Sequence, residues 1–204
     1  MYVPKSFCMD NPDEITAFVH AHSFGVLVST TEARPVATHL PLVYDAEAHC
    51  LFSHMAKANP QAQTLHGQDV LAIFSGAHAY ISPAWYEVPA AVPTWNYTAV
   101  HMYGRCTRIE DQEALADLLE RMIRFYEPSS SLPKQQHEGF YRNMMNAIVG
   151  FRIDVTDIQG AAKLSQNKSV EIRQRVVAQL RATGDVNAAA VAQAMEKRLP
   201  QQEA

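Results

Sequence analysis

The chain has 204 residues, of which 48% are hydrophobic and 19% are charged, as is typical of a globular protein with a sizeable core. Its formal net charge is −4. Proteins that bind DNA through charge alone carry a basic excess, so that class is disfavoured. The three cysteines form no CxxC pair, and no apolar run reaches the length of a membrane span. We therefore expect a cytoplasmic protein with reduced thiols and no membrane partner.

The first expected element is a helix in the segment DNPDEITAFVHAHSFG. Asp10 or Asn11 can cap it, and Pro12 suits its first turn. Short strands separated by turn residues follow, at 24–30, 36–45, 49–55, 69–75 and 78–83, and then a long strand at 94–109. Such regular spacing predicts an antiparallel barrel or sandwich rather than βαβ units.

The hydrophobic period then changes. It predicts helices at 111–127 and 137–150, a strand at 151–158, and two more helices at 169–182 and 186–198. The whole indicates an α+β fold, with a six- to seven-stranded antiparallel barrel, flanking helices and a C-terminal helical pair. We expect one barrel domain over 1–168. The residues 169–204 would form a helical appendage packed on the barrel or on a dimer.

The segment FSHMAKANPQ combines a strand end with a helix start. Asn59 can cap a helix and Pro60 suits its first turn, while Lys57 lies just before that start. The free N–H groups of a helix start suit a phosphate, and Lys57, Ser53 and His54 would add a charge and donors. A capped surface helix with a solvated lysine explains the same residues.

The segment VATHLPLVYD contains Thr38, His39 and Leu40 directly before Pro41. Thr38 and His39 point to opposite faces by strand alternation. Pro41 cannot donate to a ladder, which places the strand at an edge or a bulge. Free backbone groups at such an edge can bind the polar rim of a flat heterocycle. An interrupted edge strand without a ligand explains the pattern equally well.

The segment KLSQNK follows the last strand of the predicted barrel. Its polar residues are Lys163, Ser165, Gln166, Asn167 and Lys168. Cationic and amide donors of this kind can anchor a phosphate or a pyrimidine-like ring. A solvated loop with a helix cap at Asn167 or Ser169 is the alternative.

No sequence motif indicates a metal site or covalent catalysis. The nine histidines include no HExxH, and no Cys/His spacing of the zinc type occurs. The sequence also has no GxGxxG, no Walker loop and no GxSxG turn. We therefore expect no metal ligand and assign no catalytic residue.

Seven short motifs occur in order across residues 1–168: MYVPKSF, HLPLVY, HMAKANPQ, AYISPAWY, VPTWNY, VHMYG and KLSQNK. Together they resemble the PaiB-like family of FMN-binding negative transcriptional regulators. The resemblance implies a split β-barrel like that of the pyridoxamine 5′-phosphate oxidase superfamily. It also implies a homodimer with FMN in the clefts between the subunits.

In such a barrel the long strand 94–109 lines the dimer cleft, which makes Trp95, Asn96 and His101 expected FMN contacts. His101 shares strand parity with Trp95 and not with Asn96. Trp95 and Asn96 therefore face opposite sides unless a bulge intervenes. An anchor in the dimer interface is the alternative role for Trp95.

Different classes of function remain open. The first is a flavin-binding regulator that acts through DNA or a regulatory protein. The second is a flavin-dependent oxidoreductase of a small molecule, since a flavin carries its own redox chemistry. A barrel that binds haem or another planar ligand is a third. The helical pair outlines a helix-turn-helix, but the basic residues of its second helix are only Lys197 and Arg198 at the end, so we expect packing or dimerisation instead.

Overall fold

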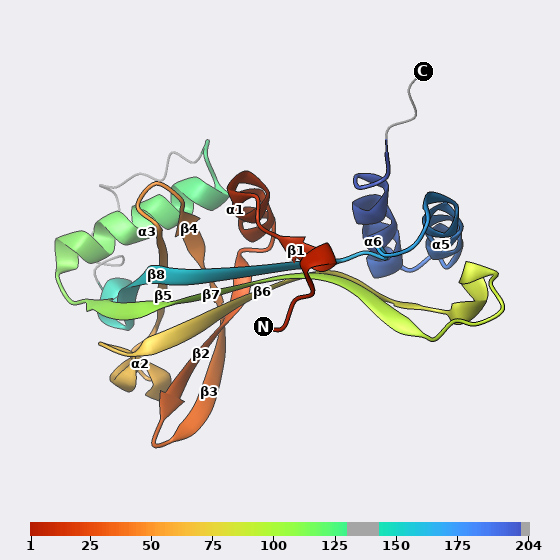
Figure 1. The fold of residues 1–204 in the computed structure, drawn as a ribbon. Helices are drawn as coiled ribbons and strands as arrows, with labels where there is room; N and C mark the ends of the chain where they lie inside the picture. The colour runs from red at the N-terminus through yellow and green to blue at the C-terminus, as the bar shows by residue number, and fades with distance from the viewer. Residues whose placement is uncertain (130–142, 201–204) are drawn as a thin grey trace. The chain divides into compact units, whose positions relative to one another are not determined.

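The computed structural model describes residues 1–129 and 143–200 (Figure 1). Its strands are β1 (Cys8–Met9), β2 (Phe24–Thr31), β3 (Arg34–Pro41), β4 (Val43–Asp45), β5 (Cys50–Ala56), β6 (Asp69–Ile81), β7 (Thr94–Ile109) and β8 (Ile148–Lys163). Its helices are α1 (Pro12–Ala21), α2 (Pro60–Thr64), α3 (Gln112–Tyr126), α5 (Val170–Ala182) and α6 (Val186–Glu196), with 3₁₀ turns at η1 (Lys5–Phe7) and η2 (Pro83–Tyr86). An antiparallel sheet combined with helices confirms the predicted α+β class.

The strands follow the order β3-β2-β6-β7-β8-β5-β4, and β1 pairs with β8. Strand β3 stands at one end of this order and contains Pro35 and Pro41, which cannot donate ladder hydrogen bonds. Its pairing with β2 is antiparallel and places Thr38 opposite Leu27. The edge position predicted for this segment is therefore confirmed.

The sheet has eight strands in the described part of the chain, whereas the sequence predicts six or seven. The segment 36–45 lies in two strands because the Leu42 N–H leaves the ladder and donates to the Ser23 carbonyl at 2.7 Å. The strands predicted at 69–75 and 78–83 are one continuous strand, β6. The short strand β1 is a further addition.

The helix predicted at 137–150 begins outside the described residues and is wrong at its other end. Residues 143–146 are helical, but strand β8 already begins at Ile148. Pairing with β5 explains the difference, because Gly150 lies opposite His54 in an antiparallel ladder. Tertiary pairing thus overrides a weak local helical pattern.

Polar caps begin the helices, largely as the sequence predicts. The caps are Asn11 for α1, Asn59 for α2, Asp111 for α3, Ser169 for α5 and Asp185 for α6. Each side-chain oxygen accepts a hydrogen bond from a backbone N–H that would otherwise be unpaired. Between α5 and α6, Gly184 has a φ of 70°, a left-handed conformation that glycine adopts without steric cost.

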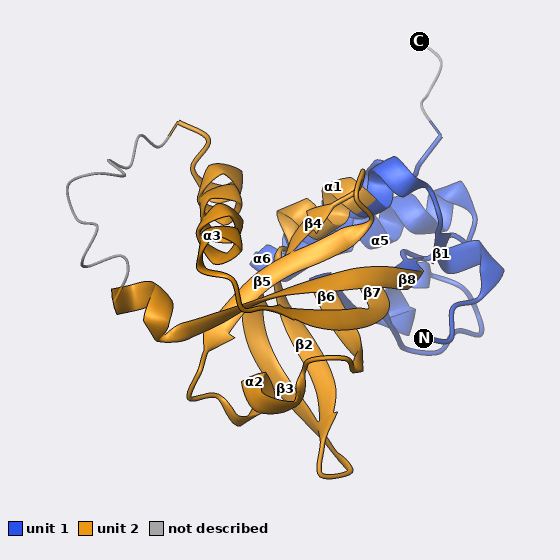
Figure 2. Cartoon of the chain, turned by 90° about the vertical axis from the view of Figure 1, so that its left-hand side faces the viewer, with its two compact units in different colours: residues 1–15, 75–100, 159–204 blue, residues 16–74, 101–158 orange. Residues whose placement is uncertain are grey.

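The chain divides into two compact units (Figure 2). Unit 1 comprises residues 1–15, 75–100 and 159–204, and unit 2 comprises residues 16–74 and 101–158. Strands β6, β7 and β8 contribute residues to both units. The helices predicted as an appendage share unit 1 with earlier segments, and the domain boundary at residue 168 stays a prediction.

Each unit has its own apolar core. The fully or almost fully buried side chains of unit 2 include Leu27, Phe74, Met102, Leu118, Phe151 and Ile153, and those of unit 1 include Ile81, Leu164, Val176, Leu180, Val191 and Met195. Burying one such side chain contributes roughly 1.5–3 kcal/mol. In unit 1 the helices α5 and α6 lie against each other, and an ion pair joins Arg181 to Glu196 at 2.7 Å. In both units the polar residues therefore lie on elements that a packed apolar core holds in place.

Candidate functional site

In unit 2, a network of polar side chains joins the start of α2 to strands β2 and β3. The Asn59 side chain donates to the Thr38 hydroxyl at 3.0 Å, and that hydroxyl donates to the side-chain amide oxygen of Gln61 at 2.5 Å. The Gln61 amide donates in turn to the Ser29 hydroxyl at 2.9 Å and to the Leu27 carbonyl at 3.2 Å. Two of the predicted cofactor contacts, Thr38 and Asn59, thus already have partners within the chain.

Lys57 lies on the turn that precedes this network and is exposed. Its backbone N–H donates to the Ala147 carbonyl at 2.9 Å, which fixes the turn while the ammonium group stays in solvent. Helix α2 has only five residues, so it contributes little dipole of its own. Any phosphate held here would depend on the charge of Lys57 and not on the helix start.

The other predicted residues of unit 2 differ in exposure. Ser53 is fully buried and donates to the Pro41 carbonyl at 2.6 Å, whereas His39 is exposed and stacks on Phe24 with ring centroids 6.3 Å apart. Leu40 belongs to the core. His54 is half-buried, and burial lowers its pKa. Among these predicted residues and Lys57, it is therefore His39, His54 and Lys57 that solvent or a ligand can reach.

His101 also belongs to unit 2 and is half-buried on β7. Its Nδ1 atom is buried and has no hydrogen-bond partner among the described residues. Burial lowers its pKa, because a neutral ring is favoured where water is excluded.

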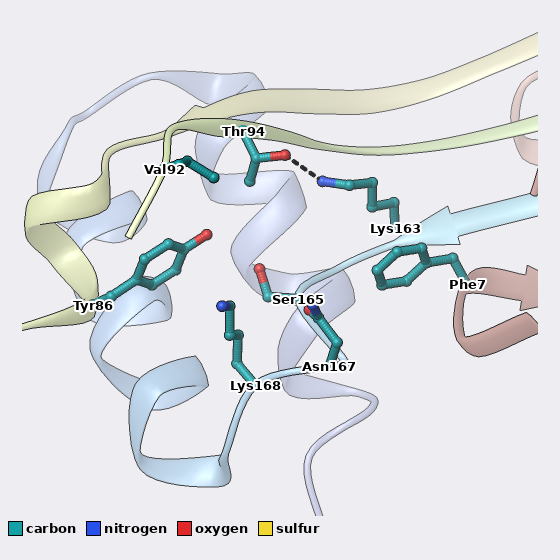
Figure 3. A pocket seen from close by; sticks show the side chains of 8 residues that line it. All are labelled: Phe7, Tyr86, Val92, Thr94, Lys163, Ser165, Asn167 and Lys168. Carbon is teal, nitrogen blue, oxygen red and sulfur yellow. Dashed lines mark hydrogen bonds between the residues drawn. The ribbon is translucent and has the colours of Figure 1, made fainter. Parts of the chain in front are cut away.

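In unit 1, the segment KLSQNK lines a pocket of about 170 Å³ (Figure 3). The polar lining consists of Thr94, Lys163, Ser165, Asn167 and Lys168, and the aromatic and apolar lining of Phe7, Tyr86 and Val92. Strand β8 extends to Lys163, five residues beyond the predicted strand, and so delivers this segment to the pocket. The structure thus brings together the polar residues that the sequence singles out here.

Ser165 and Asn96 form a buried pair on one side of the pocket. Asn96 is fully buried and donates to the Ser165 hydroxyl at 3.0 Å and to the Met195 sulfur at 3.4 Å. Ser165 has a φ of 62°, which is strained for a residue with a side chain. The Asn96 contact therefore holds Ser165 in a conformation that its backbone alone would not prefer.

The two lysines of the segment occupy different positions. Lys163 donates to the Thr94 hydroxyl at 2.6 Å and also to the Trp95 carbonyl, and burial lowers its pKa. The Lys168 ammonium lies 5.2 Å from the centre of the Tyr86 ring. Lys163 is thus fixed by the strand beside it, while Lys168 keeps its hydrogen-bond donors for another partner.

The prediction that Trp95 and Asn96 face opposite sides of β7 is confirmed. Asn96 is buried in unit 1, whereas its neighbour Trp95 is 53% exposed and faces the other way. Trp95 lies near His78 and Tyr80, with ring centroids 6.0 and 6.1 Å away. The opposed faces mean that the two side chains cannot contact the same ring within one chain.

Sequence reasoning missed several residues of both clusters. Gln61 in unit 2 and Tyr86, Thr94, Phe7 and Val92 in unit 1 were not among the predicted contacts. All of them come from segments whose motifs carry the resemblance, but no single-sequence rule brings MYVPKSF or AYISPAWY next to KLSQNK. Gln166 is a predicted contact that instead binds its own loop, through Leu164 N–H and the Ala162 carbonyl.

A second pocket of about 450 Å³ lies in unit 2 between α1, β4 and α3. His20, Phe125 and Arg121 line it, and none of the predicted site residues does. Among the described residues, no group of three or more His, Cys, Asp or Glu side chains could hold a metal ion. No helix in residues 1–129 or 143–200 is long and apolar enough to span a membrane.

The donors in each unit fit the chemistry of FMN. A flavin needs cations for its phosphate, and Lys57 in unit 2 or Lys163 and Lys168 in unit 1 can supply them. A flavin ring needs apolar surface, which the exposed Trp95 and Tyr80 offer. When bound, FMN supplies redox chemistry that no side chain provides.

The comparison with known proteins assigns the family. Residues 1–157 match the family model described as "Putative FMN-binding domain". The chain is 41% identical to the protease synthase and sporulation protein PAI 2 of Bacillus subtilis, covering 99% of this chain and all of that one. It is 32% identical to an uncharacterized protein of Saccharomyces cerevisiae, over 68% of this chain and 91% of that one.

Solved structures share the fold at low identity. The flavocytochrome Anf3 of Azotobacter vinelandii superimposes with a TM-score of 0.62 at 14% identity, covering 79% of this chain and 72% of that one. An FAD- and haem-binding protein of Mycobacterium smegmatis gives a TM-score of 0.59 at 11% identity, covering 87% of this chain and 80% of that one. The predicted split-barrel fold is confirmed, and the chain belongs to the PaiB-like family of FMN-binding proteins, with FMN as its cofactor.

Proposed function

We propose that the protein is a cytoplasmic homodimer that binds FMN and acts as a negative regulator of gene expression. The observation that carries this proposal is the 41% identity, over nearly the whole of both chains, to a protein named for protease synthesis and sporulation. Identity that extends through α5 and α6 relates these helices, and not only the residues that match the flavin-binding domain, to that protein. Free thiols at Cys8, Cys50 and Cys106 support a reducing compartment.

The exposed surface of unit 1 supports a homodimer. Trp95 and Tyr80 are 53% and 48% exposed with ring centroids 6.1 Å apart, and large apolar side chains exposed together are typical of protein interfaces. A two-fold dimer would bury the same patch on both copies. Sedimentation equilibrium at micromolar concentration should give twice the chain mass of 22.7 kDa, and a monomer would refute the dimer.

We propose a regulatory protein partner rather than direct reading of DNA. Arg198, at the end of the last helix, pairs with Glu14, and its carbonyl accepts from Arg173 at 2.6 Å. The start of α6 carries no cation, and three alanines follow Val186 and Asn187, whereas a recognition helix presents several polar side chains near its start. The acidic balance agrees with weak non-specific binding. Tight, sequence-independent retention of duplex DNA at physiological salt would contradict this proposal.

The proposed FMN contacts remain those that the sequence indicates: Thr38, His39, Leu40, Ser53, His54, Lys57, Asn59, Trp95, Asn96, His101, Lys163, Ser165, Gln166, Asn167 and Lys168. Lys57 is the proposed contact to the FMN phosphate. Its accessible ammonium supports this role, as does the fixed backbone of its turn.

Gene deletion tests the regulatory role. Transcript profiling of the deletion strain should show a defined set of genes with raised expression, which the wild-type gene restores to normal. Unchanged transcripts would refute regulation. Anaerobic mixing of the FMN-loaded protein with NADPH tests the enzymatic alternative, because rapid bleaching of the flavin absorbance would indicate an oxidoreductase.

A further inference from the structure

The pocket in unit 1 carries two positive charges without a counter-charge. Lys163 and Lys168 both line it (Figure 3). Among the described residues, no ion pair joins a carboxylate to either lysine, and Glu87, next to Tyr86, pairs instead with Arg175 at 3.4 Å. Two ammonium groups beside one small pocket repel each other unless an anion lies between them.

Hydrogen-bond donors converge on the same space. An ammonium group has three N–H donors, and Lys163 uses two of them, on Thr94 and on the Trp95 carbonyl. One donor of Lys163 and all three of Lys168 therefore stay available in the described structure. Figure 3 shows the hydroxyl of Tyr86 directed toward the same space as the Lys168 ammonium. Burial raises the pKa of Tyr86 and a hydrogen bond with Ser165 lowers it, with burial the larger effect, so the hydroxyl stays protonated beside Ser165.

The pocket is built before any ligand arrives. Gln166 ties the loop to Leu164 and Ala162, and the buried Asn96 holds Ser165 at its left-handed φ of 62°. Ordering a loop in advance lowers the entropy that binding would otherwise cost. A strained, buried serine in a fixed loop is a feature that an ordinary surface turn does not need.

Size restricts the class of ligand. A water molecule takes about 30 Å³ of liquid, so a pocket of about 170 Å³ has room for about five waters. That space suits a phosphate group with the first atoms of an ester, and it does not enclose a flavin ring system. Phe7 and Val92 add an apolar wall beside the cations. We propose that this pocket, formed by Lys163, Ser165 and Lys168 with Tyr86, is a binding site for a phosphate group.

The phosphate can come from two sources, and the inference goes beyond the regulatory role in either case. It is inorganic phosphate or a small phosphomonoester, or it is the phosphate end of FMN itself. In the first case the pocket is a second site, separate from the FMN contact proposed at Lys57, and the FMN contacts proposed at Lys163, Ser165 and Lys168 are wrong. In the second case the phosphate of FMN is held in unit 1.

Calorimetric titration of the full-length, flavin-free protein with inorganic phosphate tests the site, because bound FMN would fill the pocket if its own phosphate lies there. Chloride at the same ionic strength provides the blank, and Lys168→Met is the principal variant, because Lys168 makes no hydrogen bond that the fold requires. Lys5→Met is the matched control, since Lys5 is an exposed lysine of unit 1 outside the pocket. Circular dichroism establishes that both variants are folded.

We expect saturable binding of phosphate to the wild type and to Lys5→Met, and binding at least tenfold weaker to Lys168→Met. Losing a charged hydrogen bond changes affinity by roughly ten- to a hundredfold. Titration of flavin-free, full-length protein with FMN and with riboflavin separates the two sources. A second site leaves both flavin affinities unchanged in Lys168→Met, whereas the FMN phosphate clamp lowers the affinity for FMN and not for riboflavin.

Two results would overturn the proposal together. The first is that Lys168→Met binds phosphate as tightly as the wild type. The second is that the ratio of FMN affinity to riboflavin affinity is the same in Lys168→Met as in the wild type. The regulatory proposal would survive that outcome, because the transcript profile of the deletion strain does not depend on this pocket. Conversely, unchanged transcripts would refute the regulatory role and would not change the result expected from the phosphate titration.

Discussion

The two lysine-bearing turns of the protein, residues 57–60 in unit 2 and 163–168 in unit 1, have similar sequence chemistry and different structures. Around the first, Thr38, Asn59 and Gln61 satisfy one another, and the lysine is exposed. In the second, the lysines line a pocket together with donors that have capacity left. Polar residues near a helix start can thus be a structural cap or a ligand site.

The difference lies in what the amide side chains bond to. In unit 2 the Gln61 side-chain amide joins α2 to β2 and β3, and both its oxygen and its N–H donors are hydrogen-bonded. In unit 1 the Asn96 amide exchanges hydrogen bonds with Ser165 and donates to the Met195 sulfur, whereas the lysines remain open to the pocket. A closed network stabilises the fold, whereas an open one can also bind.

The largest expected effect is the loss of stability in Gln61→Ala. Gln61 is only 3% exposed, and its removal leaves the hydroxyl groups of Thr38 and Ser29 without their buried partner. Each unsatisfied buried group costs about 1–3 kcal/mol, so we expect a total loss of about 2–6 kcal/mol for the two hydroxyl groups. Urea unfolding followed by circular dichroism measures it.

Gln63→Ala is the matched control, because Gln63 is exposed on the same helix and makes one hydrogen bond, to the Lys57 carbonyl. We expect it to cost less than about 0.5 kcal/mol. Equal losses of stability in Gln61→Ala and Gln63→Ala would mean that the buried hydrogen bonds of Gln61 do not stabilise the fold.

The next effect concerns ligand affinity at the first turn. We expect Lys57→Ala to weaken FMN binding by roughly ten- to a hundredfold, the range for losing a charged contact to phosphate. Riboflavin lacks the phosphate, so its affinity should hardly change. Fluorescence quenching with both flavins measures the contrast.

Inorganic phosphate sharpens the comparison between the turns. Its binding to the pocket in unit 1 should be unaffected by Lys57→Ala, because the cationic donors that line that pocket are Lys163 and Lys168. If Lys57→Ala leaves FMN affinity unchanged while Lys163→Ala or Lys168→Ala lowers it, unit 1 is the phosphate clamp and the first turn is structural.

Much of the fold follows from local rules in the sequence. The hydrophobic period identifies α1, α3, α5 and α6, and capping chemistry locates their starts. Pro41 predicts an edge or a bulge, and β3 stands at the end of the strand order. What local rules miss is decided by partners distant in sequence, such as the pairing of β5 that turns residues 148–150 into strand.

The same limit applies to the candidate site. Strand parity separates Trp95 from Asn96 correctly, because alternation is a property of the strand alone. Sequence reasoning cannot tell that Asn59 bonds to Thr38, or that Tyr86 faces Lys168, since both contacts join distant segments. Chemistry-bearing residues can be recognised locally, but whether they are already satisfied requires the folded chain.

A smaller loss of stability is expected for Asn96→Ala in unit 1. The side chain is fully buried and exchanges hydrogen bonds with Ser165 at 3.0 and 3.2 Å. We expect a cost of about 1–3 kcal/mol, measured by urea unfolding. Ser165→Ala should cost about as much, and the double variant should cost less than the sum of the two, because both single changes break the same pair. Strict additivity would show that the two side chains act independently.

The smallest effect is a dependence of stability on pH that arises in unit 2. Burial lowers the pKa values of His22, His54 and His101, so the folded protein binds protons less readily than the unfolded chain. Their contribution to stability is complete above the ordinary histidine pKa of about 6.5 and is lost as the pH falls below it. We therefore expect the free energy of unfolding to decrease between pH 7.5 and 5.5, a range that ends above the ordinary pKa values of carboxyl groups. The three histidines are partly exposed, so solvent screening keeps each contribution small. In His54→Gln, which has no titrating ring, the decrease measured by urea unfolding at each pH should be shallower than in the wild type. If the free energy of unfolding of His54→Gln decreased with falling pH as steeply as that of the wild type, groups other than His54 would cause the pH dependence.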